Sequence, residues 1–171
     1  MAHYVNNKQL YETLVKFKDQ TKKCEKEGKQ LPRIPEYVGE CIWQIANRLS
    51  TKPNFVNYTY RDEMISDGIE NCVMVIKNFD PEKSKNPFAY FTQIIYYAFI
   101  RRIQKEKKQT YIKHKSLENF AVNEALFDTQ DGDGSHFTTN SVDGLNSEYM
   151  SDFVQNFEDN LKKKREKANE Q

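Results

Sequence analysis

Hydrophobic residues recur at helical spacing in three successive stretches of the first half of the chain. The first stretch follows Asn6 and Asn7, which can cap a helix, and its apolar stripe is clear as far as Phe17. The second stretch follows a proline-containing linker, and the third follows the sequence TYRD, which fits a capping box. The pattern predicts an all-α protein. Its first helix starts at Asn6-Asn7 and fades into lysine- and glutamate-rich sequence before Gly28, the second spans residues 36–50, and the third follows the TYRD sequence and ends near Phe79.

The second and third predicted helices each have one apolar face. In the second helix, helical spacing assigns these residues to the core: Val38, Cys41, Ile42, Ile45, Ala46 and Leu49. In the third helix, the apolar face consists of Ile65, Ile69, Cys72, Val73 and Ile76, and the opposite face carries Glu63, Asp67, Glu70 and Asn71. An acidic helix face is usually only solvated, and binding of a partner is the alternative.

A fourth helix is predicted to begin at Asn86-Pro87, which combines a capping residue with proline at the first helical position. Its apolar residues leave almost no polar side: Phe88, Tyr90, Phe91, Ile94, Ile95, Tyr96, Tyr97, Phe99, Ile100 and Ile103. A small domain cannot cover the whole circumference of such a helix, so we expect an exposed patch that marks a binding site. The alternative is a central helix that is buried all round.

Charge is strongly segregated, although the formal net charge is only +1. The segment Arg101–Lys115 carries +6, the segment Ser116–Asn160 carries −10, and the segment Leu161–Gln171 carries +3. Aromatic side chains followed directly by cations are typical of single-strand nucleic-acid binding. The acidic block would oppose phosphates, so we do not expect tight DNA binding by the isolated protein.

The composition indicates a modest core with polar ends. Of the 171 residues, 37% are hydrophobic, and the mean hydropathy is −0.88. The three cysteines have no CxxC spacing, which predicts buried free thiols rather than a disulfide framework. No apolar run approaches the ~18 residues of a membrane span and no signal peptide opens the chain, so we expect a cytoplasmic protein without a membrane partner.

The sequence after Lys115 predicts less regular structure. Residues 127–140 are rich in turn formers, and a calcium loop starting at Asp131 is rejected because its twelfth position is Val142 instead of glutamate. A short amphipathic helix follows, with Phe153, Val154 and Phe157 on its apolar side. This helix is either a frayed terminal element or a peptide that docks in a partner's groove.

Catalytic chemistry has no support in the sequence. The three histidines are scattered, and neither a glycine-rich phosphate loop nor a nucleophile motif is present. We therefore expect no enzymatic activity, no cofactor and no metal site. The predicted organisation is an N-terminal helix and linker (residues 1–34), a helical core (35–115), an acidic flexible loop region (116–147) and a C-terminal helix or tail (148–171).

Several of these segments resemble a known family. The segments Glu63–Ile69, Val73–Asp80 and Asn86–Ile103 resemble domain 2 of bacterial sigma-70-type initiation factors. About the first two thirds of the chain, from Tyr4–Lys8 to Arg102-Ile103, is similar to the late-transcription sigma factors of T-even-type bacteriophages. The resemblance implies a small helical bundle like sigma-70 domain 2, with a loosely ordered C-terminal tail.

The resemblance also implies two binding surfaces. In the family, the positions of Glu63, Ser66 and Asp67 contact the coiled coil of the polymerase β′ clamp, and Glu70 and Asn71 share their helix face. The aromatic helix matches the segment that melts the promoter and reads a −10-like element, with an opened A·T-rich single strand as the ligand. The predicted DNA-binding residues are Phe88, Tyr90, Phe91, Ile94, Ile95, Tyr97, Ala98, Arg101, Arg102, Lys105, Lys107 and Lys108.

The chain departs from the family at the DNA-facing positions. The paired tryptophans of the family are replaced by Ile94-Ile95, which can wedge at a base step but stack poorly on a flipped base. The glutamine of the reading turn is replaced by Ala98, so the base preference of the family does not transfer.

The C-terminus gives a further expectation, because phage members of the family bind a DNA sliding clamp through a hydrophobic and acidic peptide. Phe153, Val154 and Phe157 lie in a segment of similar character, and a coactivator is a further possible partner. Two other functions stay open. One is a helical DNA-binding regulator that acts without polymerase, and the other is a structural helical protein with no nucleic-acid role.

Overall fold

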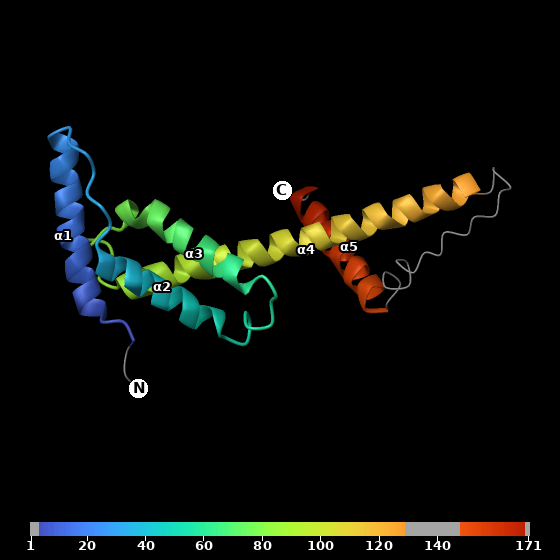
Figure 1. Cartoon of the computed structure of the whole chain (residues 1–171), viewed down its shortest axis with the longest axis horizontal. Helices are drawn as coiled ribbons and strands as arrows, with labels where there is room; N and C mark the ends of the chain where they lie inside the picture. Colours follow the sequence, from blue (N-terminus) through green and yellow to red (C-terminus); the bar gives the residue numbers. More distant parts are fainter. Residues whose placement is uncertain (1–3, 129–147, 170–171) are drawn as a thin grey trace. The chain divides into compact units, whose positions relative to one another are not determined.

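The computed structural model describes residues 4–128 and 148–169, with side chains described outside 121–128 and 148–150. Figure 1 shows the elements, all of which are helical in the described residues. The all-α prediction is therefore confirmed. The elements are α1 (Asn7–Lys26), α2 (Glu36–Ser50), α3 (Arg61–Val75), the 3₁₀ turn η1 (Ile76–Asn78), α4 (Pro87–Asp128) and α5 (Glu148–Asn169).

The chain forms two compact units, Met1–Gln104 and Lys105–Gln171, and α4 contributes to both. The first unit contains α1, α2, α3, η1 and the beginning of α4. The second unit contains the remainder of α4 and α5. None of the helices in the described parts of the chain is both long and apolar enough to cross a membrane.

Helix α1 starts where the sequence predicts and extends further than its apolar stripe. The Asn6 side chain accepts hydrogen bonds from the backbone N–H groups of Lys8 at 3.1 Å and Gln9 at 3.2 Å, which confirms the predicted cap. The helix continues beyond Phe17 to Lys26, and Thr21 is still buried. Gly28 then adopts a φ of 63°, a conformation that favours glycine and ends the helix.

The other predicted caps have different outcomes. The Asn86 side chain accepts a hydrogen bond from the backbone N–H of Ala89 at 3.1 Å, so the cap of α4 is confirmed. The predicted capping box before α3 is wrong, because the residue before the helix is Tyr60 and no side chain caps it. The threonine of the TYRD sequence lies one position too early to serve as the cap.

The core of the first unit is built around the aromatic beginning of α4. Phe91, Ile95 and Phe99 are 0% exposed. Phe55, from the loop after α2, packs edge-on against Phe99 with ring centroids 5.2 Å apart. The other fully buried side chains of this core include Leu10, Leu14, Val38, Ile42, Ile45, Met64 and Cys72.

Most of the apolar face predicted for the third helix is confirmed, because Cys72 and Ile76 are buried and Ile65 and Ile69 pack against the core. The prediction is wrong for Val73, and Gly68 takes the closest contact instead. The buried residues of α3 are Met64, Gly68 and Cys72, whereas Val73 is 45% exposed. A Cβ atom on Gly68 would lie 3.0 Å from Cγ2 of Ile95 and 3.1 Å from Cε1 of Phe99. The missing side chain lets α3 approach α4 closely, and this contact turns Val73 towards solvent.

All three cysteines are free thiols, as predicted. Cys41 and Cys72 are buried, and Cys24 is only partly buried, so the prediction of burial is wrong for Cys24. Burial raises the pKa of the Cys72 thiol to about 12. Cys72 thus behaves as a small apolar core residue.

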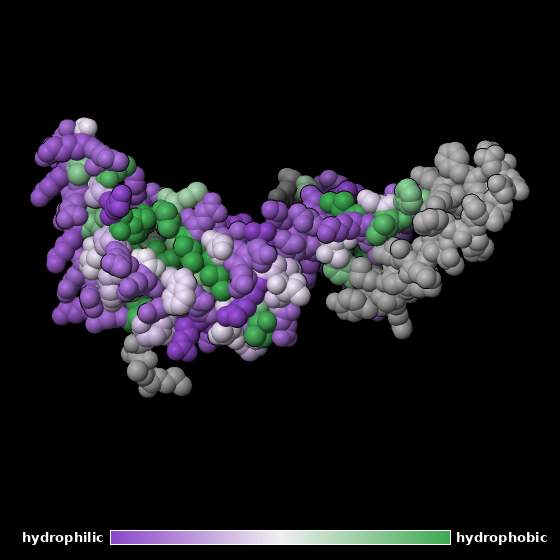
Figure 2. All heavy atoms as spheres, viewed as in Figure 1, coloured by the Kyte–Doolittle hydropathy of each residue, from purple (hydrophilic) through white to green (hydrophobic). Residues whose placement is uncertain are grey.

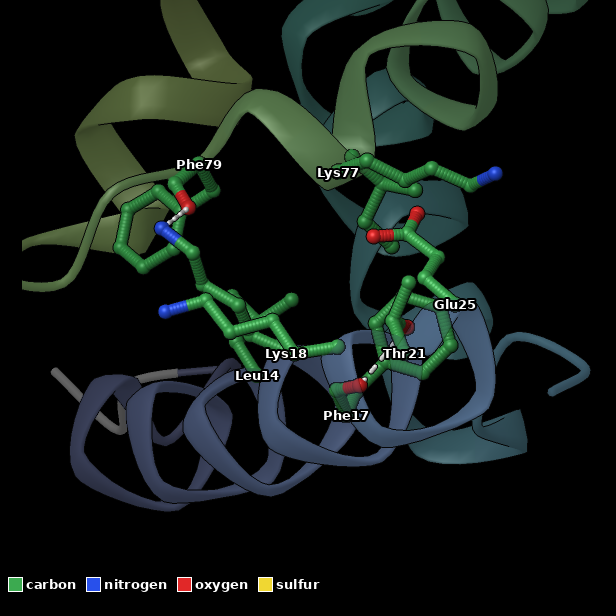
Figure 3. Close-up of a pocket in the computed structure, with 9 residues that line it drawn as sticks. Leu14, Phe17, Lys18, Thr21, Glu25, Lys77 and Phe79 are labelled. Carbon is green, nitrogen blue, oxygen red and sulfur yellow. Dashed lines mark hydrogen bonds between the residues drawn. The ribbon is translucent and has the colours of Figure 1, made fainter. Parts of the chain in front are cut away.

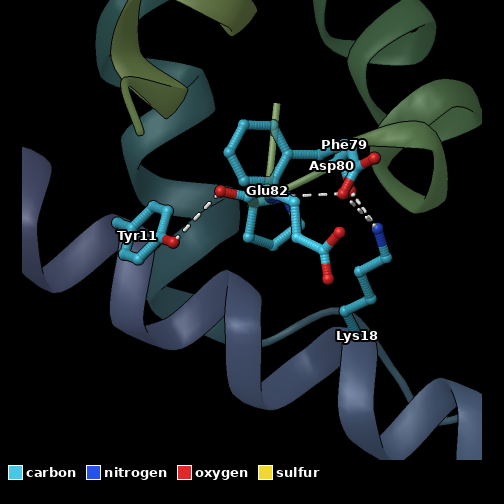
Figure 4. Close-up of polar contacts among 6 residues, drawn as sticks. Tyr11, Lys18, Phe79, Asp80 and Glu82 are labelled. Carbon is cyan, nitrogen blue, oxygen red and sulfur yellow. Dashed lines mark hydrogen bonds and ion pairs between the residues drawn. The ribbon is translucent and has the colours of Figure 1, made fainter. Parts of the chain in front are cut away.

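The turn between η1 and α4 is held on α1 by polar contacts, which Figure 4 shows. The Lys18 ammonium donates to the Phe79 carbonyl at 3.0 Å and contacts a carboxylate oxygen of Asp80 at 3.3 Å. The Tyr11 hydroxyl donates to the Pro81 carbonyl at 3.2 Å. The backbone N–H of Glu82 and the Lys18 ammonium lower the pKa of Asp80. These contacts fix the position from which α4 begins.

A small hollow of about 150 Å³ lies between α1 and η1. Figure 3 shows its lining residues, with Phe17 and Phe79 among the apolar side chains and Lys18 and Lys77 among the charged ones. Its apolar residues Leu14, Phe17, Ile76 and Phe79 are themselves 2–4% exposed, so the hollow is shallow. We assign it a packing role.

The two helical glycines of the first unit allow a matched test of the contact between α3 and α4. Gly39 lies in α2, and a Cβ atom added there would meet nothing within 4 Å, so Gly39→Ala should raise the free energy of unfolding by about 0.5–1 kcal/mol through helix propensity. Gly68→Ala gains the same propensity but crowds Ile95 and Phe99, so it should lower the free energy of unfolding by about 1 kcal/mol.

Urea denaturation followed by circular dichroism measures both variants. Equal stabilisation by the two substitutions would contradict the close contact at Gly68. The decisive quantity is the difference between the variants, because it cancels the propensity that both alanines share.

Candidate functional site

One side of α3 faces away from the core and combines acidic with apolar residues. We call this surface the α3 outer face and define it by Glu63, Ser66, Glu70, Val73 and Met74, all of which are exposed. The Val73 side chain is 45% exposed and that of Met74 is 65% exposed. Figure 2 shows hydrophobic residues along α3 on the viewed face, bordered by hydrophilic ones. Three of the five predicted polymerase-binding residues lie on this surface.

The other two predicted polymerase-binding residues are turned towards α4. The Arg102 guanidinium binds both carboxylate oxygens of Asp67, with N–O distances of 2.7 Å each. Arg101 donates from Nη2 to the Asn71 side-chain oxygen at 2.7 Å. Asp67 and Asn71 are therefore engaged within the chain, and each binds an arginine that the sequence predicts to contact DNA.

The pair between Asp67 and Arg102 has the geometry of a structural contact. The Asp67 side chain is only 29% exposed and that of Arg102 only 18%. Two nitrogen atoms of Arg102 each donate to a different oxygen of the same Asp67 carboxylate. Exposed ion pairs contribute about 0–1 kcal/mol, but a bidentate arginine–carboxylate pair of limited exposure is stronger. A charge reversal at Asp67 would break this pair, so its effect on partner binding would also include a change in the packing of α3 on α4.

Three of the predicted DNA-binding residues of α4 belong to the core. Phe91 and Ile95 are 0% exposed and Ala98 is 1% exposed. Side chains buried to this degree cannot contact a base while the core is closed, so a direct role in DNA binding would require the core to open. The loop residue Phe55 and the glycine face of α3 cover more of α4 than its apolar pattern indicates.

Three further predicted residues lie at the edge of the core. Tyr90 donates its hydroxyl hydrogen to the Val75 carbonyl at 3.3 Å, and burial raises the pKa of its phenol. Phe88 donates its backbone N–H to the Asn7 side-chain oxygen at 3.0 Å. Ile94 is partly buried against the same core. The side chains of all three are less exposed than that of Tyr97.

The exposed side of α4 in the first unit carries the polar and aromatic groups that are open to a ligand. We call it the α4 outer face and define it by Gln93, Tyr96, Tyr97, Arg101 and Gln104, all exposed. Tyr97 is 54% exposed and Tyr96 is 39% exposed. The set of residues predicted from the sequence lacks the two glutamines. They lie opposite Phe91, Ile95 and Phe99 on the helix, and a helical wheel centred on those residues would have identified them.

The second unit contains the remaining predicted residues. Lys105, Lys107 and Lys108 are exposed on its part of α4. This helix continues to Asp128, so residues 116–128 are helical and the predicted loop region is wrong there. The rest of that region, residues 129–147, lies outside the described residues.

The predicted docking residues of α5 pack within the second unit. The rings of Tyr111 and Phe157 stack with centroids 4.6 Å apart, and Phe153 stacks on Phe157 at 6.2 Å. Val154 is 7% exposed. Glu158 accepts a hydrogen bond from the Tyr111 hydroxyl at 3.1 Å. Hydrogen bonds from Lys115, the larger effect, and from Tyr111 lower the pKa of the Glu158 carboxyl group. The apolar side of α5 is thus already covered by α4.

The described residues hold no group of three or more histidine, cysteine or acidic side chains in a position to bind a metal ion. The described surfaces expose acidic and apolar groups on α3 and aromatic and guanidinium groups on α4. We consider these surfaces as binding sites.

A double-mutant cycle tests the structural role of the pair between α3 and α4. Asp67→Asn and Arg102→Gln should each lower the free energy of unfolding by about 1–3 kcal/mol, because each leaves a partly buried charge without its partner. The coupling energy should reach about 1–2 kcal/mol in urea denaturation. The exposed pair of Lys29 and Glu27, at 71% and 54% exposure, is the control and should couple by less than about 0.5 kcal/mol.

Comparison with known proteins adds no assignment to these surfaces. No protein-family model matches the chain, and no curated protein matches it significantly.

Proposed function

We propose that the chain is a sigma-type initiation factor that binds core RNA polymerase through the α3 outer face and holds an opened promoter strand on the α4 outer face. The observation that carries the proposal is the exposure of Val73 and Met74 beside Glu63 and Glu70 on a helix whose other sides are packed. The same surface contains positions that the family resemblance assigns to the polymerase.

The α3 outer face has the composition of a protein-binding surface. Large exposed apolar side chains with a polar rim favour association with another protein, and methionine adapts well to a partner's surface. Glu63, Ser66 and Glu70 follow one another at helical spacing, so a partner helix could lie along them. Two carboxylates on this face favour a basic partner through electrostatic complementarity, as a coiled coil with arginine and lysine side chains would provide.

The α4 outer face suits a single strand better than a duplex. Stacking on an aromatic side chain contributes about 1–3 kcal/mol per base, and Tyr97 offers an exposed ring for it. Arg101 lies one helical turn beyond Tyr97 and can contact a phosphate with the guanidinium donors that Asn71 does not use. Unstacking costs a few kcal/mol per step, so an easily opened A·T-rich site is favoured.

Other predicted residues take supporting roles in this proposal. Arg102 fixes α4 against α3 through Asp67, and the buried Phe91 and Ile95 support the helix from inside. Lys105, Lys107 and Lys108 supply additional positive charge for the phosphate backbone. A polymerase partner would place the protein in the cytoplasm of a bacterial host cell.

Docking on a sliding clamp through Phe153, Val154 and Phe157 remains a separate proposal. These residues pack on Tyr111 within the second unit, so α5 would have to leave α4 before a clamp could bind them. The proposal for polymerase and promoter binding does not depend on this step.

Binding to core RNA polymerase tests the proposal. The double variant Glu63→Lys/Glu70→Lys should reduce the amount of polymerase captured in a pull-down by about tenfold or more, because it places cations opposite a basic partner. The matched control is Glu12→Lys/Glu82→Lys, which makes the same charge change at two exposed positions outside the α3 outer face. Asp67 is left intact because it binds Arg102.

Capture by the wild type and the control but not by the α3 variant would support the proposal. Equal capture by all three proteins would move the polymerase site away from α3. If the wild type captures no polymerase, the initiation-factor proposal fails, and DNA binding by the protein alone would then favour a regulator that acts without polymerase.

A further inference from the structure

A second surface of the first unit, on α2, combines an exposed tryptophan with two arginines. Trp43 is the chain's single tryptophan and is 57% exposed. It lines a groove of about 440 Å³, a size in the range of about 300–1,000 Å³ that is usual for ligand sites. The residues that line the groove are Tyr4, Trp43, Gln44, Asn47, Arg48, Thr51 and Arg61.

The groove carries positive charge that is held in place but not neutralised. The guanidinium carbon of Arg48 lies 5.4 Å from the ring centroid of Tyr4. Arg61 donates from Nε to the buried Ser50 hydroxyl at 2.9 Å. Among the described residues, neither arginine forms an ion pair with a carboxylate, and the groove has no acidic lining residue. Glu40 precedes Trp43 by one turn of α2 but does not line the groove.

The polar neutral groups of the groove are suited to recognition of hydrogen-bonding groups. The Asn47 amide donates to the Trp43 carbonyl at 2.9 Å, which fixes it beside the indole. The Thr51 hydroxyl donates to the Arg48 carbonyl at 2.9 Å and keeps its lone pairs for an external donor. Gln44 adds a second amide with both donor and acceptor capacity.

We propose that this groove binds a nucleotide unit, with its base against Trp43 and its phosphate between Arg48 and Arg61. Tryptophan offers a large flat surface for a base, and arginine binds phosphate through paired donors. The amides of Gln44 and Asn47 can meet the hydrogen-bonding edge of the base. An apolar peptide would use the tryptophan but would leave both guanidinium groups unpaired.

The nucleotide unit in the groove belongs to a single strand of nucleic acid. This assignment to a strand rests on the proposed function. It shares no residue with the α3 outer face or the α4 outer face. A strand held there would therefore be a contact in addition to that of Tyr97. A free nucleotide carries the same base and phosphate as a unit of a strand, so the experiment compares binding of a free nucleotide with binding of an oligonucleotide.

The single tryptophan makes the groove directly observable in the full-length protein. An oligothymidylate of about eight nucleotides, within the usual length of single-strand sites, should quench Trp43 fluorescence at low salt. An abasic oligonucleotide of equal length and charge should quench much less, because it cannot stack. Thymidine monophosphate should quench only at much higher concentration. Equal quenching by the abasic oligonucleotide, or no quenching by oligothymidylate, would overturn the proposal.

Substitutions test the location with an end-labelled oligothymidylate followed by fluorescence anisotropy. Trp43→Ala should weaken binding by about fivefold or more through lost stacking. Arg48→Gln should weaken binding and reduce the slope of log affinity against log salt by about 0.7, the value for one single-strand phosphate contact. Arg33→Gln removes the same charge from an exposed position outside the groove and is the matched control.

The remaining outcomes separate this proposal from the function proposed above. Binding that is unaffected by Trp43→Ala but lost in Tyr97→Ala would place the strand on the α4 outer face and overturn the groove. Quenching by thymidine monophosphate as strong as that by oligothymidylate would assign the groove to a free nucleotide and overturn the strand role. Loss of polymerase capture with intact Trp43 quenching would reject the initiation-factor proposal and keep the groove.

Discussion

The close contact of Gly68 with Ile95 and Phe99 determines how α3 and α4 present their other sides. The two helices meet along the glycine side of α3, where a Cβ atom at Gly68 would lie 3.0 Å from Cγ2 of Ile95, so a larger residue there would push them apart. This orientation buries Met64 and Cys72 and leaves Val73 exposed. It also brings Asp67 to the flank of α4, where the carboxylate binds both donors of Arg102.

The aromatic beginning of α4 has two competing uses, and the structure favours the core. Burial of a large apolar side chain contributes about 1.5–3 kcal/mol. Stacking of one base on an aromatic ring contributes about 1–3 kcal/mol, so withdrawing Phe91 or Phe99 from the core to meet DNA would give no net gain. A strand is better served by Tyr97, which is already 54% exposed and costs no packing to engage.

The sequence predicted the all-α class, the start of α1, the cap of α4 and the apolar face of α2 correctly, because these depend on local spacing and capping. On α3 it placed Val73 in the core and missed Gly68, since apolar periodicity cannot recognise a glycine as the contact residue. It also proposed the buried residues Phe91, Ile95 and Ala98 as DNA contacts, because an all-round apolar pattern does not show which side of α4 faces the core. Trp43 was missed because its groove forms only when Tyr4, α2 and Arg61 come together.

The two outer faces are coupled through few contacts, and this limits how a partner on α3 could act on α4. The described links near the α4 outer face are the Gly68 contact, the bidentate pair of Asp67 with Arg102, and the hydrogen bond of Arg101 to Asn71. A protein bound along Glu63 and Glu70 would restrain the α3 backbone that carries these side chains. Since Arg101 and Arg102 lie one helical turn after Tyr97, that restraint would be transmitted to the residues proposed to meet a strand. A partner on α3 would thus lower the entropy cost of fixing the side chains of Tyr97 and Arg101 on the proposed strand.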